Sequence, residues 1–165
     1  MGDVIKVLDY YHGAPLIEFL YRKNQLINMV SEKTTEEHIT SAILEAMKML
    51  RIKLIDYTTS PDISVSPGRY VFYLELDKIS KSEAVKGIDK ILDKELRLAN
   101  PAYDRARKGN RLSSIKIELL APGTFNAMKE ILYKKGISKN QLKIPRVLSN
   151  NQEAVNIIKK NIQAH

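Results

Sequence analysis

Two short apolar runs at the start of the chain predict a β-hairpin. Residues 4–11 and 16–21 are rich in β-branched and aromatic side chains, and His-Gly-Ala-Pro at residues 12–15 is a turn signal between them. A polar break at residues 22–25 precedes a third, shorter strand at residues 26–30. A ribbon this thin buries little apolar surface by itself. We therefore expect the chain to have been cut from a larger protein.

Helical and strand periods alternate along the rest of the chain. A threonine pair followed by two glutamates, residues 34–37, marks a helix start, and Ile39, Ile43 and Met47 continue as one apolar face at helical spacing. Strands are predicted at residues 53–59, 69–76 and 114–120, and further helices at about residues 82–98, 124–136 and 150–162. This order predicts an α+β fold, in which a small mixed β-sheet is covered by helices and preceded by the hairpin.

The composition is that of one ordinary globular domain. Of the 165 residues, 44% are hydrophobic and 28% are charged, which is enough apolar material for a core. No run of about 18 apolar residues suggests a membrane span, and the N-terminus lacks the apolar block of a signal peptide, so we expect a cytoplasmic protein. There is no cysteine and the three histidines are scattered, so the sequence predicts neither a disulfide nor a metal site.

The net charge of +8 is unevenly distributed along the chain. Residues 1–85 contain 10 basic and 12 acidic side chains, whereas residues 86–165 contain 17 basic and 7 acidic ones. A basic half is typical of a solvated face or of a protein that binds an anionic partner, such as nucleic acid, a nucleotide or an acidic substrate. Charge alone leaves these alternatives open.

Several short motifs carry little information when each is taken alone. Asp3 has the character of a turn former, and Lys33 that of a surface residue beside a helix start. Residues 67–73 faintly echo an RNA-recognition strand, but an ordinary two-sided sheet strand has the same pattern. A basic α+β RNA-binding module is one interpretation, although Glu75 and Asp77, at the end of the strand predicted at residues 69–76, fit poorly beside RNA phosphates. A regulatory domain for a small ligand is another interpretation.

The end of the chain raises a separate question. Lys143 and Arg146 flank Ile144-Pro145, and the proline prevents a regular helix or a central strand at this point. Taken alone, the two cations are surface residues on a tail loop. A functional interpretation needs the rest of the sequence.

In order and at their spacing, the motifs resemble those of one protein family. The chain reads Gly-Asp at residues 2–3, Arg-Lys at 22–23, Ser-Glu-Lys-Thr at 31–34, Gly-Thr-Phe at 123–125 and Asn-Gln-Leu-Lys-Ile-Pro-Arg at 140–146. The series resembles the domain junction and C-terminal domain of the plant-type, auxin-responsive acyl acid amido synthetases, within the acyl-adenylate-forming superfamily. The resemblance covers nearly the whole chain. Leu142 departs from it, because the family usually has an aromatic residue there.

The resemblance implies a C-terminal lid over an ATP-dependent adenylation site. Lys143 matches the family's lid lysine, a catalytic group that reaches the nucleotide phosphates while the acyl-adenylate forms. Asp3 and Arg22 match groups that contact the ribose. Lys33 matches a second nucleotide-side lysine, and Lys23 lies at the hinge. The implied cofactors are ATP and Mg²⁺, bound mainly by an N-terminal domain that this sequence lacks.

The resemblance also implies how the chain is divided and what it works with. Residues 1–33 are expected to form a β-hairpin and hinge segment at the junction, and residues 34–165 the α+β lid. The expected partner is the N-terminal adenylation domain of the same full-length protein, because nothing here matches the family's phosphate-gripping loop. The expected substrates are a small carboxylic acid and an amine or amino acid. We expect the chain alone to be inactive and to bind no nucleic acid specifically.

Overall fold

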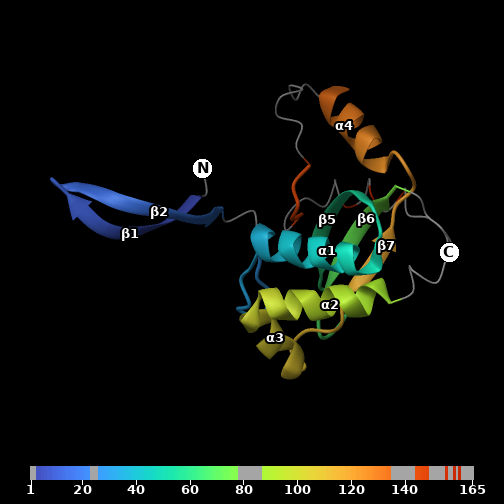
Figure 1. Cartoon of the computed structure of the whole chain (residues 1–165), viewed down its shortest axis with the longest axis horizontal. Helices are drawn as coiled ribbons and strands as arrows, with labels where there is room; N and C mark the ends of the chain where they lie inside the picture. Colours follow the sequence, from blue (N-terminus) through green and yellow to red (C-terminus); the bar gives the residue numbers. More distant parts are fainter. Residues whose placement is uncertain are drawn as a thin grey trace.

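The structure, a computed structural model, describes residues 3–22, 26–77, 87–134 and 144–148, together with positions 155, 158 and 160. These residues form a projecting hairpin and a compact part that we call the α+β body (Figure 1). The α+β fold class predicted from the sequence is confirmed. Lys23 and Lys143, two of the predicted site residues, lie outside the described residues.

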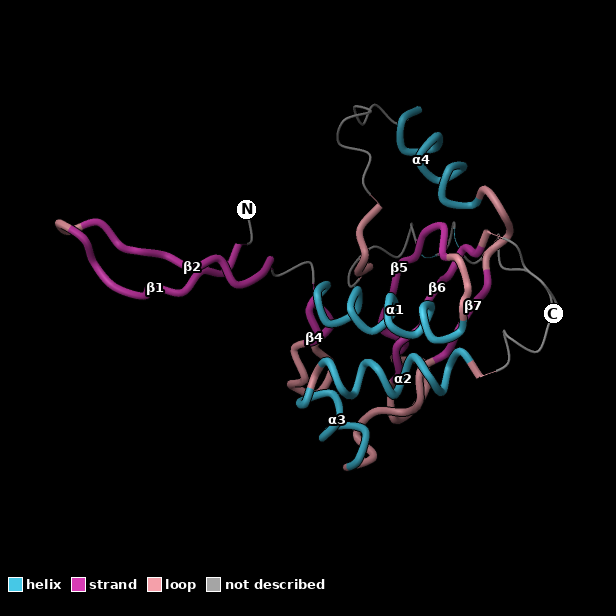
Figure 2. The backbone as a smooth tube through the Cα atoms, viewed as in Figure 1, coloured by secondary structure: helices cyan, strands magenta, loops and turns pink. Residues whose placement is uncertain are grey.

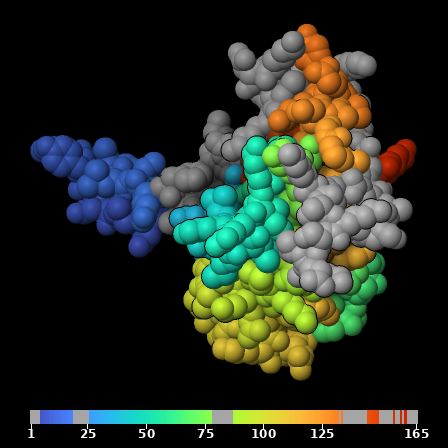
Figure 3. Space-filling model, turned by 45° about the vertical axis from the view of Figure 1, so that its right-hand side comes forward, coloured from blue at the N-terminus to red at the C-terminus, as the bar shows by residue number. Residues whose placement is uncertain are grey.

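The predicted hairpin is present and extends away from the α+β body as a two-stranded ribbon (Figures 1 and 3). Strand β1 (Asp3–Tyr11) pairs antiparallel with β2 (Ala14–Arg22) through a two-residue turn. His12 and Gly13 have positive φ angles of 48° and 84°, which a tight hairpin turn of this hand requires at both central positions. The apolar side chains at residues 5–18 of the ribbon are exposed.

A mixed sheet forms the centre of the α+β body (Figure 2). Strand β5 (Leu54–Asp62) pairs antiparallel with β6 (Arg69–Leu76), and β6 pairs parallel with β7 (Lys116–Leu119). Residues 144–148 extend the sheet at its β5 edge through a parallel β-bridge. The most central strand, β6, therefore has a neighbour on each side and is buried over almost its whole length.

Two helices cover one face of this sheet (Figure 2). They are α1 (Glu36–Leu50) and α2 (Ile88–Ala99), and the short helix α3 (Pro101–Lys108) follows α2 directly. The apolar face of α1 packs into a core that also contains Tyr70 and Phe72 of β6. The helical period at the start of α1 therefore predicted both the helix and its buried side.

Helix α1 begins where the sequence predicts because Thr35 caps it. Thr35 Oγ1 accepts the His38 amide at 3.4 Å, and His38 Nδ1 accepts the Thr35 amide at 3.3 Å. This reciprocal pair satisfies two N–H groups that have no partner inside the helix. Burial lowers the pKa of His38, and Glu37 opposes the shift, so the neutral imidazole that can accept this hydrogen bond is favoured.

The opposite face of the sheet packs against helix α4 (Thr124–Lys134) and against residues that follow it. Val71 and Tyr73 of β6 point into this second core. Its other buried members are Leu120, Phe125, Met128, Ile144, Leu148, Val155 and Ile158. Because β6 contributes to both cores, the sheet is covered on its two faces.

A buried glutamate of β6 fixes the start of α4. Glu75 is 4% exposed, and its two carboxylate oxygens accept the Gly123 amide at 2.7 Å and the Phe125 amide at 2.9 Å. These amides lie at the helix N-terminus, where no carbonyl of the helix can accept from them and where a negative charge is favourable.

The predicted strands differ from the observed ones at two places. The third strand, predicted at residues 26–30, is only β3 (Leu26–Ile27), which pairs with β4 (Thr34–Thr35), because the chain then turns into a loop. Strand β5 continues through Pro61 to Asp62, beyond the predicted end at residue 59. The Thr59 amide donates to Arg146, at the edge of β5 away from β6. Alternate residues of a strand point their N–H groups to the same edge, so the missing N–H of Pro61 interrupts no pairing with β6.

The predicted helices also need correction. The helix expected at about residues 82–98 is observed as α2, which begins at Ile88, because Gly87 before it has a left-handed φ angle of 91° and is not helical. Residues 78–86 lie outside the described residues. Helix α3 was not predicted from the sequence, in which the helical pattern ends at about residue 98. Proline is well placed at the first position of a helix, and Asn100 caps it. Of the helix predicted at residues 150–162, positions 155 and 158 are described and helical.

Candidate functional site

Asp3 and Arg22 come together at the open end of the hairpin. They are directly opposite partners in the register of β1 and β2, so their Cα atoms lie about 4.5–5.5 Å apart. This is the end of the hairpin that leads toward the α+β body, because β2 ends here and β3 begins at Leu26. The two positions matched to ribose contacts therefore lie side by side on the backbone.

Lys33 lies on the loop between β3 and β4 and is exposed to solvent. Its φ angle of 45° and that of Ser31, 73°, both fall in the left-handed region, which disfavours residues other than glycine. The Lys33 amide donates to Asn28 Oδ1 across the loop at 3.2 Å. Such a conformation persists only where the surroundings determine it, so the loop must be fixed by contacts with the rest of the domain.

The loop folds around the carboxylate of Glu32, which is 2% exposed. The amides of Met29 and Val30 donate to it at 2.8 Å and 2.7 Å, and the Tyr70 hydroxyl donates at 2.6 Å. Burial, and after it the charge of Glu32, raises the pKa of Tyr70 well above its usual value, so the hydroxyl keeps its proton and donates. Three donors satisfy a carboxylate whose burial is otherwise costly.

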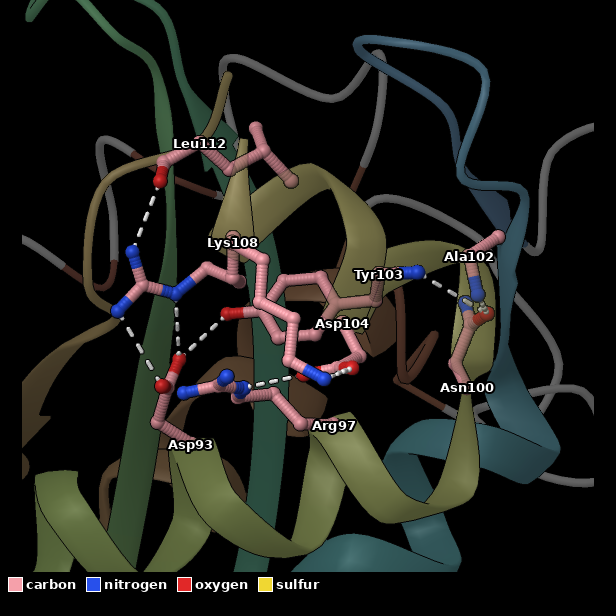
Figure 4. Close-up of polar contacts among 9 residues, drawn as sticks. Asp93, Arg97, Asn100, Ala102, Tyr103, Asp104, Lys108 and Leu112 are labelled. Atoms are coloured by element: carbon pink, nitrogen blue, oxygen red, sulfur yellow. Dashed lines mark hydrogen bonds and ion pairs between the residues drawn. The ribbon is translucent and has the colours of Figure 1, made fainter. Parts of the chain in front are cut away.

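Asn100 joins the other side of the loop to the start of α3. Its Nδ2 group donates to the Glu32 carbonyl oxygen at 3.0 Å and to Thr34 Oγ1 at 2.9 Å. Its Oδ1 atom accepts two amides in the first turn of α3, at 2.9 Å and 3.2 Å (Figure 4). We call Glu32, Thr34, Tyr70 and Asn100 the loop anchor. The residues on both sides of Lys33 belong to it and are buried, while Lys33 itself is exposed.

An open groove of about 670 Å³ lies beside this loop. Its lining is mostly apolar and comes from β3, the loop after it, the end of β5 and the connection between β5 and β6. It includes Leu26, Met29, Val30, Pro61, Ile63 and Val65. A Cβ atom on Gly68 would lie 2.3 Å from Cε of Met29, so the glycine permits the methionine to lie against the start of β6. The loop that carries Lys33 therefore contributes one wall of the groove.

The segment that follows Lys143 in the sequence is attached to β5. The Thr59 amide donates to the Arg146 carbonyl at 2.9 Å, and the Leu148 amide donates to the Thr59 carbonyl at 2.8 Å. Thr58 Oγ1 adds a hydrogen bond to the Pro145 carbonyl at 2.7 Å. Backbone pairing and side-chain contacts together hold this irregular segment at the sheet edge.

Arg146 has a structural position in this attachment. Its guanidinium group forms an ion pair with Asp56, donates to the Tyr57 carbonyl at 2.8 Å and lies 4.3 Å from the centre of the Tyr57 ring. Sequence reasoning did not identify Asp56 or Tyr57 as its partners, because they lie about 90 residues earlier in the chain. Of the two cations that flank Ile144-Pro145, Arg146 is thus engaged inside the domain, and Lys143 falls outside the described residues.

Part of the basic half is engaged in contacts between α2 and α3 (Figure 4). Asp93 accepts from Arg107 Nε at 3.0 Å and from the Tyr103 hydroxyl at 2.7 Å. Arg107 Nη1 also donates to the Leu112 carbonyl at 2.8 Å, which joins the turn after α3 to the same cluster. Burial and the Asp93 charge raise the pKa of Tyr103, so its hydroxyl remains a donor.

A second carboxylate of this region neutralises two further cations. Asp104 accepts from Arg97 Nε at 2.7 Å and pairs with Lys108 Nζ at 2.6 Å (Figure 4). The carboxylates of Asp93 and Asp104 therefore join α2 to α3. The cations of Arg97, Arg107 and Lys108 are paired with these carboxylates. Their positive charge does not by itself indicate a site for an anionic ligand.

The strand that suggested RNA binding cannot serve as a base-stacking platform. Tyr70 and Phe72 on one face and Tyr73 on the other are each at most 2% exposed, because helices and following residues cover both faces of the sheet. Stacking with a single-stranded base needs an aromatic side chain at the surface. The RNA-binding interpretation of this strand is therefore wrong.

Two further features concern the described part of the chain only. Within it, no group of three or more His, Cys, Asp or Glu side chains is arranged to hold a metal ion. Among the described helices, none combines the length and the apolar character needed to cross a membrane.

Comparison with known proteins agrees with the arrangement of these elements. Residues 37–152 match the model of the GH3 family C-terminal domain. An indole-3-acetic acid-amido synthetase of Arabidopsis thaliana is 31% identical over 158 residues, which cover 90% of this chain and 26% of that protein. A jasmonoyl–L-amino acid synthetase of Nicotiana attenuata is 27% identical over 166 residues, which cover 98% of this chain and 28% of that protein.

The solved structures give the same result. The structure of a GH3.15 acyl acid amido synthetase matches with a TM-score of 0.76 and 28% identity, over 99% of this chain and 30% of that one. The chain thus spans less than a third of the length of the relatives that it matches. The family resemblance inferred from the sequence is confirmed: this chain belongs to the GH3 family of acyl acid amido synthetases and carries the family's C-terminal domain.

Proposed function

We propose that this chain is the lid of a synthetase that uses ATP to activate a carboxylic acid and then joins the acyl group to an amine or amino acid. In the first step the carboxylate attacks the α-phosphorus of ATP and pyrophosphate leaves. In the second step the amine attacks the acyl carbonyl and AMP leaves. The observation that carries the proposal is that nearly the whole chain aligns with proteins named as amido synthetases.

The hairpin fits the ribose side of such a site. A carboxylate offers two acceptor oxygens to the hydroxyl groups of a ribose, and an arginine offers several donors. Asp3 and Arg22 occupy opposite backbone positions on adjacent strands, which supports the assignment of both positions to one ligand group. We assign Lys23, the next residue after Arg22, to the hinge between the hairpin and the α+β body.

The two lysines fit the phosphate side. When a carboxylate approaches the α-phosphorus, negative charges come together, and a cation delivered to that place stabilises the transition state. We assign this role to Lys143, which directly precedes the segment attached to β5, and we assign a supporting contact with the nucleotide to Lys33. The exposed position of Lys33 supports its assignment. Mg²⁺ and most of the ATP contacts belong in this proposal to the N-terminal adenylation domain of a full-length cytoplasmic enzyme.

The test uses an enzyme in which this chain is joined to its adenylation domain. Lys143→Ala should slow ATP–pyrophosphate exchange by roughly 10²-fold or more, as the loss of a preorganised charge contact does. Lys143→Arg should restore little of the lost exchange rate, because a planar guanidinium group does not replace a compact ammonium group. Amide formation from a pre-made acyl-adenylate should be affected much less, because the phosphates have then largely left.

Two controls accompany this experiment. The melting temperature of the Lys143 variants should stay unchanged, because the proposed role of Lys143 is a contact with the nucleotide and not with the protein's own core. The 165-residue chain by itself should show no ATP–pyrophosphate exchange. Equal loss in both half-reactions, or a strongly lowered melting temperature, would reject the lid role of Lys143.

A further inference from the structure

The loop that carries Lys33 is held from inside the α+β body and only weakly by its own strands. Strands β3 and β4 contain two residues each, so their ladder supplies few hydrogen bonds. By contrast, Glu32 reaches the central strand β6 through Tyr70 and the start of α3 through Asn100. The position of the loop therefore depends on side chains that lie far from it in the sequence.

The buried residues on either side of Lys33 direct its side chain toward solvent. Glu32 is 2% exposed and Thr34 is fully buried, so the side chains on either side of Lys33 point into the domain. The backbone at Lys33 has a φ angle of 45°, which an L-residue adopts at a cost that neighbouring contacts must offset. With both neighbours fixed inward, the Lys33 side chain is presented to solvent.

We propose that Glu32, Tyr70 and Asn100 are positioning residues that hold Lys33 in its left-handed conformation and present its ammonium group to the nucleotide. This inference rests on the proposed function of Lys33 and deepens it. It also assigns Lys33 to the α+β body: because the anchor joins the loop to β6 and α3, the lysine moves with that body, while Asp3 and Arg22 move with the hairpin.

The chain offers a matched pair of variants for the test. Tyr70→Phe removes the hydroxyl that donates to Glu32 but keeps the ring, which packs 5.2 Å from the ring of Tyr103. Tyr73→Phe is the control. Tyr73 lies on the same strand, is 2% exposed and faces the opposite core, where its hydroxyl is 3.5 Å from Ser60 Oγ. Both variants lose one buried hydroxyl, and only the first touches the loop anchor.

The first measurement is hydrogen exchange on the 165-residue chain, which requires neither ATP nor a partner domain. The amides of Met29 and Val30, which donate to Glu32, should exchange at least roughly tenfold faster in Tyr70→Phe than in the wild type. The amides of α1 should be unchanged, and Tyr73→Phe should leave the loop unchanged. Unaltered protection of Met29 and Val30 in Tyr70→Phe would overturn the inference.

The second measurement is the KM for ATP in the adenylation half-reaction of the joined enzyme. Lys33→Ala should raise this KM by roughly tenfold, and Tyr70→Phe should reproduce most of that rise with a smaller change in kcat. Because Tyr70 acts through Lys33, adding Tyr70→Phe to Lys33→Ala should have little further effect. Independent, multiplying effects would mean that Tyr70 does not act through Lys33.

The two measurements distinguish a failure of the proposed nucleotide role of Lys33 from a failure of the positioning role of the loop anchor. If Lys33→Ala leaves the KM for ATP unchanged, the proposed nucleotide role of Lys33 is rejected, whatever the exchange data show. If Lys33→Ala raises the KM but Tyr70→Phe does not, the role of Lys33 stands and the positioning role of the anchor is rejected. Support for the inference requires faster exchange at Met29 and Val30 together with non-additive effects on the KM.

Discussion

Arg146 makes contacts that only a guanidinium group can make together. It pairs with Asp56, donates to the carbonyl of Tyr57 and lies over the ring of the same tyrosine. The Arg146 and Asp56 side chains are 26% and 15% exposed, so solvent screens their pairing only in part. A planar fork with a stacking face is a property of arginine that lysine lacks.

We expect Arg146→Lys to lower the free energy of unfolding by about 1–3 kcal/mol, because the hydrogen bond to Tyr57 and the stacking contact are lost. Urea unfolding of the 165-residue chain measures the change. The control is Lys129→Ala, since Lys129 lies 3.9 Å from the same Asp56 but is 40% exposed. Its removal should change the free energy by about 0.5 kcal/mol or less. A loss of about 0.5 kcal/mol or less in Arg146→Lys, no larger than in the control, would mean that a positive charge is sufficient beside Asp56 and that the shape of the guanidinium group contributes little.

His38 makes the cap of α1 sensitive to pH. Burial lowers its pKa in the folded state, so the unfolded chain binds a proton more readily than the folded one. Stability is therefore complete above the unfolded pKa of about 6.5 and decreases as the pH falls below it. Protonation of the imidazole also removes the Nδ1 lone pair that accepts the Thr35 amide.

The comparison that tests this is His38→Gln, because glutamine at this position of a capping box keeps an acceptor and does not titrate. Between pH 7 and 5, the free energy of unfolding of the wild type should fall more steeply than that of His38→Gln. Urea unfolding at several pH values measures both slopes. Parallel curves over this range would show that His38 does not couple protonation to folding.

At the scale of elements, Glu75 links the sheet to helix α4. The glutamate belongs to β6, and the amides that it accepts belong to the turn and first residues of the helix. Glu75 is 4% exposed, and both of its carboxylate oxygens accept backbone amides. A glutamine side chain at this position would point its own NH₂ group at one of these backbone N–H groups.

Glu75→Gln should therefore destabilise the domain by about 1–3 kcal/mol through an unsatisfied buried donor. Glu130→Gln is the matched control, because Glu130 lies exposed on helix α4, whose start Glu75 caps. It should change the free energy of unfolding by about 0.5 kcal/mol or less in the same urea experiment. A Glu75→Gln variant as stable as the control would mean that the cap does not stabilise α4.

At the scale of the whole molecule, both faces of the central strand β6 are covered, since cores lie on both sides of it among the described residues. The net charge of +8 nevertheless attracts polyanions. We expect single-stranded oligonucleotides to bind the 165-residue chain weakly at low salt, without sequence preference, and to lose most of their affinity at physiological salt. Titrations at the two salt concentrations measure this. Tight, sequence-dependent binding at physiological salt would revive the RNA-binding interpretation through another surface.

Local pattern was sufficient to predict most elements of this domain. The hairpin, the apolar face of α1 and the strand β6 follow from periods and turn residues within a few positions of one another, and such periods depend on local geometry alone. The order of motifs also predicted the family, because each motif and its spacing are visible in the sequence. Helix α3 was missed because Asn100-Pro101 both ends one helix and caps the next.

The contacts of the candidate site were decided by tertiary structure. The register of the hairpin places Arg22 opposite Asp3, and Tyr70 donates to Glu32 across 38 positions of sequence. Arg146, which taken alone in the sequence is a surface cation on a tail loop, is paired with Asp56. No local pattern encodes such partners, because they meet only after the strands and helices have packed. The sequence by itself therefore determined which residues are present and in what order, and the packing around β6 determined which of them are buried anchors and which, like Lys33, are presented to solvent.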